Sequence, residues 1–114
     1  MAHYLVELYT PKPAWVALDQ NGRQRFFELI SSGMAGLSAF GIEAVALGEI
    51  DATKMHAAPQ QFFAIWRFPD EVALNALLSG IATSGWHNYF ETINAAGTGT
   101  NLPGHLVQLL AAKG

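Results

Sequence analysis

Charged residues are scarce in this chain. Only 13% of its 114 residues are Asp, Glu, Lys or Arg, whereas 51% are hydrophobic. An ordinary soluble domain carries about 25% charged residues. The composition excludes intrinsic disorder, which requires low hydrophobicity and high charge. It also indicates that more surface is buried than one monomer of this size can bury alone, so we expect an oligomer.

Cysteine is absent, which excludes disulfides, thiolate catalysis and Cys-ligated metal or iron–sulfur centres. The remaining candidate metal ligands include four histidines, His3, His56, His87 and His105. No two of them stand at the i, i+4 spacing that places two ligands on one helix face. We therefore expect no metal site.

Basic residues form no cluster. Six Lys and Arg stand against nine Asp and Glu, for a net charge of −3. Nucleic-acid binding requires a basic surface because phosphate contacts supply most of the affinity, so we expect no nucleic-acid partner. The uncharged stretch of residues 72–90 is interrupted by glycines and by His87 and Asn88, so we expect no membrane span. The first residues have no signal-peptide pattern, and we expect a cytoplasmic protein.

Hydrophobic patterns predict four strands and two long helices. The strands are expected at Tyr4–Tyr9, Ile42–Ile50, Phe62–Phe68 and Tyr89–Ala95. One helix should begin near Gln20 with Asp19 as its N-cap and end at Gly41. The other should begin near Glu71 with Asp70 as its N-cap and end at Gly85.

The resulting order is β-α-β-β-α-β, followed by a short helix that begins near Leu102 and has Pro103 in its first turn. This order is typical of the ferredoxin-like α+β fold, in which two helices cover one face of an antiparallel sheet. Phe62–Phe68 is apolar on both faces apart from Arg67, so we expect it at the centre of the sheet. We expect one domain over residues 1–114.

The open face of such a sheet should be polar if it meets water. Here the first and third strands have little polar content on either face. A second copy of the same sheet is the simplest cover for that face. We therefore expect a homodimer in which two sheets form a barrel.

Three segments carry a family resemblance. They are the opening strand His3–Tyr9, the strand and turn Phe63–Asp70, and the segment Gly85–Phe90 before the last strand. With this topology, the chain resembles the dimeric α/β-barrel superfamily. That superfamily includes antibiotic-biosynthesis monooxygenases and muconolactone-isomerase-like, EthD-like and stress-responsive barrel proteins. The chain looks like an uncharacterised branch of it, and because the superfamily hosts many activities, the fold alone does not fix a function.

The haem-degrading branch of this superfamily ligates iron through a His on the second helix. Here the corresponding helix, about Glu71–Ser84, contains no His. The resemblance therefore implies no haem, and we expect no cofactor.

Glu7 and Arg67 are candidate catalytic residues. Each is the only charged residue of a strand expected at the centre of the sheet. Burial of either charge alone would cost several kcal/mol, so we expect the two side chains to pair. The two charges either form a structural ion pair that fixes the register, or reach the rim of the barrel, or form a site for a polar ligand group with Glu7 as proton acceptor.

His87 is the third candidate catalytic residue, because a His between Trp86 and Tyr89 could act as an acid or a base. The alternative is a His whose hydrogen bonds are satisfied at a helix–strand junction. Tyr9 shares strand parity with Glu7 and should face the same space. Tyr9, Tyr89 and Trp66 are the candidate substrate-binding residues, although a Trp in such a strand is more often part of the core.

We expect these residues to line a cavity between the sheet and the two helices. Trp66 and Arg67 have opposite parity, so only one of them can face Glu7, and charge pairing favours Arg67. Gly33 and Gly36 should thin the first helix above the sheet, which leaves room either for a ligand or for a close contact between this helix and the sheet. The sequence leaves two functions open. One is a cofactor-independent enzyme, isomerase, lyase or monooxygenase-like, acting on a small aromatic or polyketide-like molecule. The other is a non-catalytic dimeric binding or stress-response protein.

Overall fold

The computed structural model describes residues 2–114. The elements, in chain order, are β1 (His3–Pro11), α1 (Pro13–Val16), α2 (Gln20–Leu37), η1 (Ser38–Phe40), β2 (Glu43–Glu49), β3 (Phe62–Phe68), α3 (Glu71–Thr83), α4 (Trp86–Tyr89), β4 (Phe90–Thr98) and α5 (Leu102–Leu110).

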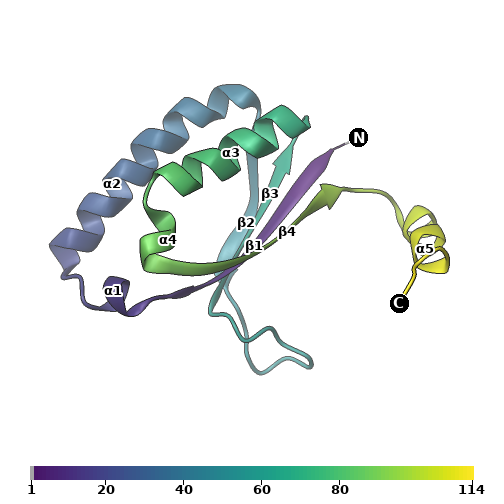
Figure 1. The fold of residues 1–114 in the computed structure, drawn as a ribbon, viewed down its shortest axis with the longest axis horizontal. Helices are drawn as coiled ribbons and strands as arrows, with labels where there is room; N and C mark the ends of the chain where they lie inside the picture. Colours follow the sequence, from purple (N-terminus) through teal and green to yellow (C-terminus); the bar gives the residue numbers. More distant parts are fainter. Residues whose placement is uncertain (1) are drawn as a thin grey trace.

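The four strands form an antiparallel sheet in the order β2-β3-β1-β4, with α2 and α3 side by side over one of its faces (Figure 1). This arrangement is the ferredoxin-like α+β fold expected from the order of the elements. The prediction that β3 is a central strand is confirmed, because β3 lies between β2 and β1.

Local signals set the ends of the long helices. The Asp19 carboxylate accepts a hydrogen bond of 2.7 Å from the Gly22 N–H, and Asp70 accepts one of 2.8 Å from the Ala73 N–H. Both predicted N-caps are thereby confirmed. Gly41 and Gly85 follow the helices with φ of +76° and +88°, a left-handed conformation that glycine adopts without a Cβ clash.

The last strand differs from its prediction. A short helical turn, α4, separates the end of α3 from β4, so the strand begins at Phe90 and extends to Thr98. Trp86 and Tyr89 therefore lie on a helical turn that precedes the strand.

Strand register decides which side chains face the helices. Glu7 pairs with Ala64 and Leu5 pairs with Trp66, so these four side chains share the face that α2 and α3 cover. Arg67 pairs with Tyr4, and its side chain belongs to the opposite face, which we call the open face.

A bulge in β2 changes the faces expected for that strand. Strict alternation would place Glu43, Val45 and Leu47 on one face. The pairing instead shifts between Ala44 and Ala46, so Val45 is the extra residue. As a result Glu43 lies opposite Arg67 on the open face, whereas Leu47 lies opposite Ala64 on the helix face.

Two hydrophobic clusters hold the helices against the sheet. The first joins β1 and β3 to α3 through Leu5, Phe68 and Leu77, which are almost fully buried. The second is aromatic and joins α1, α2 and β4 through Trp15, Phe26 and Phe90. Between these clusters the helices stand over the middle of the sheet, where the cavity described below lies.

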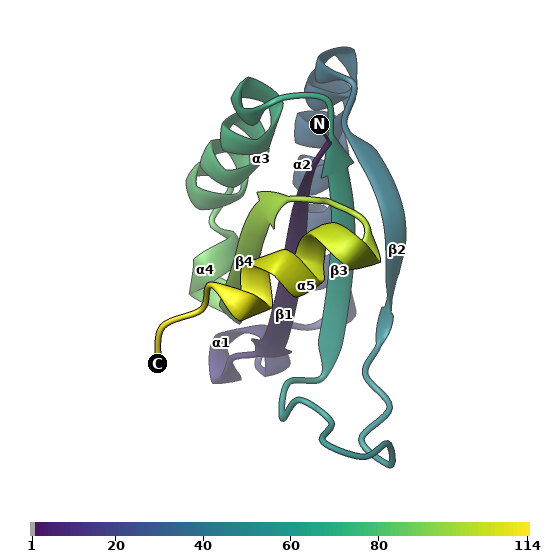
Figure 2. The ribbon, with the colours of Figure 1, turned by 90° about the vertical axis from the view of Figure 1, so that its right-hand side faces the viewer.

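The open face and α5 are uncovered in the single chain. Apolar side chains on the open face include Val6, Leu8, Phe63, Ile65 and Ile93, and Ile93 is 55% exposed. Helix α5 stands away from the sheet (Figure 1) and lies in front of its open face (Figure 2). None of the α5 residues is buried, and Leu110 is 88% exposed. No helix within residues 2–114 has the length and apolar character needed to cross a membrane.

Candidate functional site

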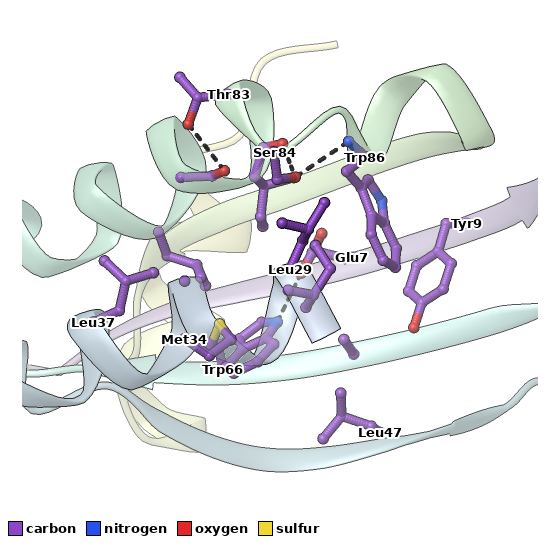
Figure 3. Close-up of a pocket in the computed structure, with 16 residues that line it drawn as sticks. Glu7, Tyr9, Leu29, Met34, Leu37, Leu47, Trp66, Thr83, Ser84 and Trp86 are labelled. Carbon is purple, nitrogen blue, oxygen red and sulfur yellow. Dashed lines mark hydrogen bonds between the residues drawn. The ribbon is translucent and has the colours of Figure 1, made fainter. Parts of the chain in front are cut away.

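A cavity of about 550 Å³ lies between the sheet and helices α2 and α3 (Figure 3). Strands β1, β2 and β3 form its floor, the two long helices form its walls, and Trp86 of α4 closes one end. Its lining is mostly apolar and consists of Glu7, Tyr9, Leu29, Ile30, Gly33, Met34, Leu37, Leu47, Ala64, Trp66, Leu77, Gly80, Ile81, Thr83, Ser84 and Trp86. Cavities of about 300–1,000 Å³ with few polar groups are typical of small-molecule sites.

Glu7 is the one charged side chain in this lining. It is only 3% exposed, and its Oε1 accepts a hydrogen bond of 2.7 Å from the Trp66 indole Nε1–H. Within residues 2–114 no Lys, Arg or His forms a salt bridge with it. Burial raises the pKa of Glu7 above its ordinary value of 4.5, and the Trp66 hydrogen bond offsets part of that rise. The site therefore holds a carboxylate that binds a proton more tightly than an exposed one.

Tyr9 lies two residues along β1, on the same face as Glu7. Its ring is held by Phe62 at 5.8 Å and by Trp86 and Phe90 in edge-to-face contacts at 5.2 and 5.7 Å between centroids. Burial, and secondly the Glu7 charge, raise the pKa of Tyr9 above 10.0. The phenol therefore stays protonated at neutral pH.

The other polar hydrogens of the cavity wall are already used within the protein. Thr83 Oγ1 donates to the backbone carbonyls of Ser79 and Gly80, and Ser84 Oγ donates to the Ile81 carbonyl. The Trp86 indole Nε1–H donates to Thr92 Oγ1. Besides Glu7, the polar group on the wall that remains available to a ligand is the Tyr9 hydroxyl.

The predicted pairing of Glu7 with Arg67 is wrong. Arg67 is exposed on the open face, opposite Glu43 of β2 and next to a second, shallower depression of about 320 Å³. Trp66 takes the place expected for Arg67, because the register puts Trp66, and not its neighbour, on the face of Glu7. A neutral N–H donor therefore partners the carboxylate where the sequence suggested a cation.

His87 and Tyr89 are not in the lining of this cavity. His87 is exposed, and its backbone carbonyl accepts a hydrogen bond of 2.7 Å from Lys12 Nζ. The Tyr89 ring packs against Trp15 and Phe26 in the aromatic cluster. The turn of α4 directs Trp86 to the cavity, whereas the next residue, His87, points away from it.

Gly33 and Gly36 do not bring α2 close to the sheet. A Cβ added at either position would meet no other atom within 4 Å. Gly33 lines the cavity and Gly36 does not. The absence of a side chain at position 33 therefore leaves space in the cavity, in line with the expected thinning of this helix.

Residues 2–114 contain no group of three or more His, Asp or Glu side chains placed to hold one metal ion. Glu7 and Tyr9 are thus the titratable side chains that the cavity brings together.

Replacement of Trp66 by Phe should raise the pKa of Glu7 further. The indole N–H stabilises the charged form of the carboxyl group, and Phe removes that donor while it keeps an apolar ring. The pKa can be followed by NMR titration of the Glu7 side-chain carboxyl carbon. The matched control is Trp86→Phe, which opens similar space but removes a hydrogen bond to Thr92. An equal or smaller pKa for Glu7 in Trp66→Phe than in the control would contradict the assigned hydrogen bond.

Comparison with known proteins places the chain by fold. The model of a family of unknown function, DUF6616, matches residues 2–112. A possible chlorite dismutase is similar in structure, with a TM-score of 0.65 and 16% identity over 89% of this chain and 46% of that one. This chain therefore spans about half the length of that protein. No curated protein matches it in sequence.

Two further solved structures resemble the chain over most of both lengths. One is a dimeric ferredoxin-like protein of unknown function from Thermobifida fusca, with a TM-score of 0.53 and 10% identity over 86% of this chain and 91% of that one. The other is a DABB family protein with a ferredoxin-like fold from Mesorhizobium loti, with a TM-score of 0.52 and 12% identity over 88% and 98%. The resemblance expected from the sequence is confirmed at the level of the fold.

Proposed function

Because the chain belongs to DUF6616, a family of unknown function, its role has to be inferred from its own site, and we propose that it binds a small, largely apolar molecule in the cavity between the sheet and helices α2 and α3. One observation carries this proposal. A carboxylate that is 3% exposed, with no cation beside it in the described chain, opens into an apolar space of about 550 Å³. A buried charge of this kind costs stability, and such groups cluster at functional sites.

Glu7 is also the group best suited to chemistry in this cavity. A carboxylate whose pKa is raised by burial is a stronger base than an exposed one, and proton abstraction needs no cofactor. We propose Glu7 as the proton acceptor of a cofactor-independent reaction of the isomerase, lyase or monooxygenase-like class. Tyr9 and Trp66 would then position the substrate, since both line the same space.

Non-catalytic binding is the second candidate. The observation that favours it is the exclusion of Arg67 and His87 from the cavity, which leaves Glu7 and a protonated Tyr9 as the titratable groups there. The two candidates differ in turnover. A bound compound that is released unchanged supports binding, and a bound compound that is converted in a Glu7-dependent manner supports catalysis.

Gly33→Leu should block the cavity and abolish binding. The new side chain would grow from α2 into open space that belongs to the cavity. The probe is N-phenyl-1-naphthylamine, a neutral apolar fluorophore whose emission rises in apolar sites. We expect enhanced emission with the native protein and at least a tenfold loss of affinity in Gly33→Leu.

Gly36→Leu is the matched control. It makes the same change on the same helix, again into open space, but outside the cavity lining. Both variants should be slightly more stable, because Leu has a higher helix propensity than Gly by roughly 1 kcal/mol. Equal loss of binding in both variants, or no emission change with the native protein, would contradict the proposed site.

We also propose that the functional unit is a homodimer joined through the open face. Apolar residues at the centre of that face, Val6, Ile65 and Ile93 among them, are flanked at one end by Glu43 and Arg67. An apolar centre with a charged rim is the pattern of a protein interface. A second copy is the occupant that fits best, because a two-fold axis through this face would set each apolar centre against its equivalent.

Helix α5 supports the same assembly. It carries Leu102, Leu106, Val107, Leu109 and Leu110, all more than half exposed except Leu106 at 50%. An apolar helix of nine residues is not stable by itself in water, and it needs a surface to pack on. Because α5 stands away from its own sheet on the side of the open face, a partner subunit seated on that face would lie within its reach (Figure 2).

A further inference from the structure

The hydrogen-bonding groups of the cavity define the kind of ligand it accepts. The indole N–H groups of Trp66 and Trp86 and the hydroxyls of Thr83 and Ser84 already donate to protein acceptors. What remains at the centre of the sheet is the Glu7 carboxylate, which is an acceptor when it is ionised.

The charge in the cavity lining excludes anionic ligands. Among the described residues that line it there is no Lys, Arg or His. A ligand carboxylate or phosphate would therefore lose its hydration without gaining a cation, and it would be repelled by Glu7 across a medium of low dielectric constant.

We propose that the ligand of this cavity is an uncharged apolar molecule with a hydrogen-bond donor, such as a hydroxyl group, that is directed at Glu7, and that carboxylates and phosphates are rejected. This inference rests on the proposed function, because it concerns the same cavity. It goes further in naming the class of ligand and the residue that selects it. The Trp66 hydrogen bond to Oε1 fixes the carboxylate and leaves Oε2 as the atom available to the ligand donor.

The Tyr9 hydroxyl does not remove this selectivity. It can donate to a ligand oxygen, but no hydrogen bond joins it to Glu7 in the described structure, so the two groups act on a ligand separately. Two probes that share the same oxygen atom, one with an O–H proton and one with a methyl group in its place, therefore isolate the contribution of Glu7.

Three naphthalenes of similar size test the proposal by calorimetry at pH 8. They are 2-naphthol, which has a donor; 2-methoxynaphthalene, which keeps the oxygen and lacks the donor; and 2-naphthoate, which is an anion. We expect 2-naphthol to bind at least about tenfold more tightly than the ether. The naphthol can donate a hydrogen bond to the Glu7 carboxylate and the ether cannot, and hydrogen bonds to charged groups are stronger than those between neutral groups. We expect no measurable binding of 2-naphthoate.

Glu7→Gln supplies a readout that a purely structural role would not change. The Trp66 N–H should keep the amide oxygen, so the amide NH₂ would face the cavity and turn an acceptor into a donor. The ratio of the affinity for 2-naphthol to the affinity for the ether should then fall to about 1, or the ether should bind more tightly. The matched control is Glu28→Gln, which removes a charge from the exposed surface of α2 and should leave the preference unchanged.

The outcomes separate this inference from the proposed function. Equal affinity for naphthol and ether, or tightest binding of naphthoate, would overturn the ligand class while the cavity remained a binding site. Absence of binding for all three, together with no response to N-phenyl-1-naphthylamine, would overturn the binding function itself. An unchanged preference in Glu7→Gln would show that Glu7 does not select the ligand.

Discussion

Glu7→Gln should make the protein more stable at neutral pH, by about 1–3 kcal/mol in the free energy of unfolding. Glu7 is a nearly fully buried carboxylate with a single neutral hydrogen-bond donor as partner and no described cation. Gln keeps the acceptor for Trp66 and removes the charge. A gain in stability with a loss of ligand selectivity is the behaviour expected of a residue that is kept for function.

The pH dependence of stability should change in the same variant. Burial raises the pKa of Glu7 in the folded protein above the ordinary value of 4.5, so the folded state binds the proton more tightly than the unfolded state. The stabilisation from the protonated form is then fully present below the unfolded pKa and is lost as pH rises through the folded pKa. Gln does not titrate, so its advantage over the native protein should grow as pH rises from about 4.5.

Urea unfolding from pH 4 to pH 8 measures this difference. The control is Glu28→Gln, an exposed change on α2 that should shift stability by less than about 0.5 kcal/mol at every pH. A Glu7→Gln variant that is less stable than the native protein at pH 7, with the same pH dependence, would show that Glu7 is a structural residue.

Ile93→Glu should dissociate the proposed dimer. Ile93 is an exposed apolar side chain of β4 on the open face. In the dimer a carboxylate at this position would be taken out of water with no cation to pair with it. Such an uncompensated charge costs about 3–5 kcal/mol, which corresponds to a dissociation constant at least about 100-fold larger. Sedimentation velocity at micromolar concentration should change from dimer to monomer.

Val72→Glu is the matched control for this change. Val72 is 67% exposed on α3, which packs on the opposite side of the sheet. It receives the same charge, and a carboxylate in the first turn of a helix is favourable. The control should remain dimeric. A native protein that sediments as a stable 12.3 kDa monomer would contradict the interface, and dissociation of both variants would contradict its placement on the open face.

Truncation after Thr100 tests the contribution of α5 to the same interface. None of its residues is buried in the single chain, so its removal should leave the fold intact and weaken only the dimer. Obligate interfaces typically bury more than about 2,000 Å² in total, and the apolar residues of α5 would supply part of that area.

The sequence by itself determined the order of the main elements and the ends of the two long helices, because those helix ends depend on local chemistry. Asp19 and Asp70 accept hydrogen bonds from N–H groups three residues later, and Gly41 and Gly85 supply the left-handed conformation after each helix. Interactions between residues so close in the sequence can be predicted from the sequence alone. Glu7 was likewise identifiable, because a lone charge in an apolar strand is conspicuous whatever surrounds it.

The tertiary structure alone decided which side chains meet Glu7. Side chains alternate across a strand, so a shift of one residue in register exchanges Trp66 for Arg67, and nothing local to β3 sets that register. The pairing of Glu7 with Ala64 placed an indole N–H beside the carboxylate, and the turn of α4 left His87 exposed while Trp86 reached the cavity. The spacing of α2 and α3 over the sheet, set by packing at both ends, left the space between them. Contacts across 59 residues of chain, such as that between Glu7 and Trp66, are fixed only when the whole sheet has formed.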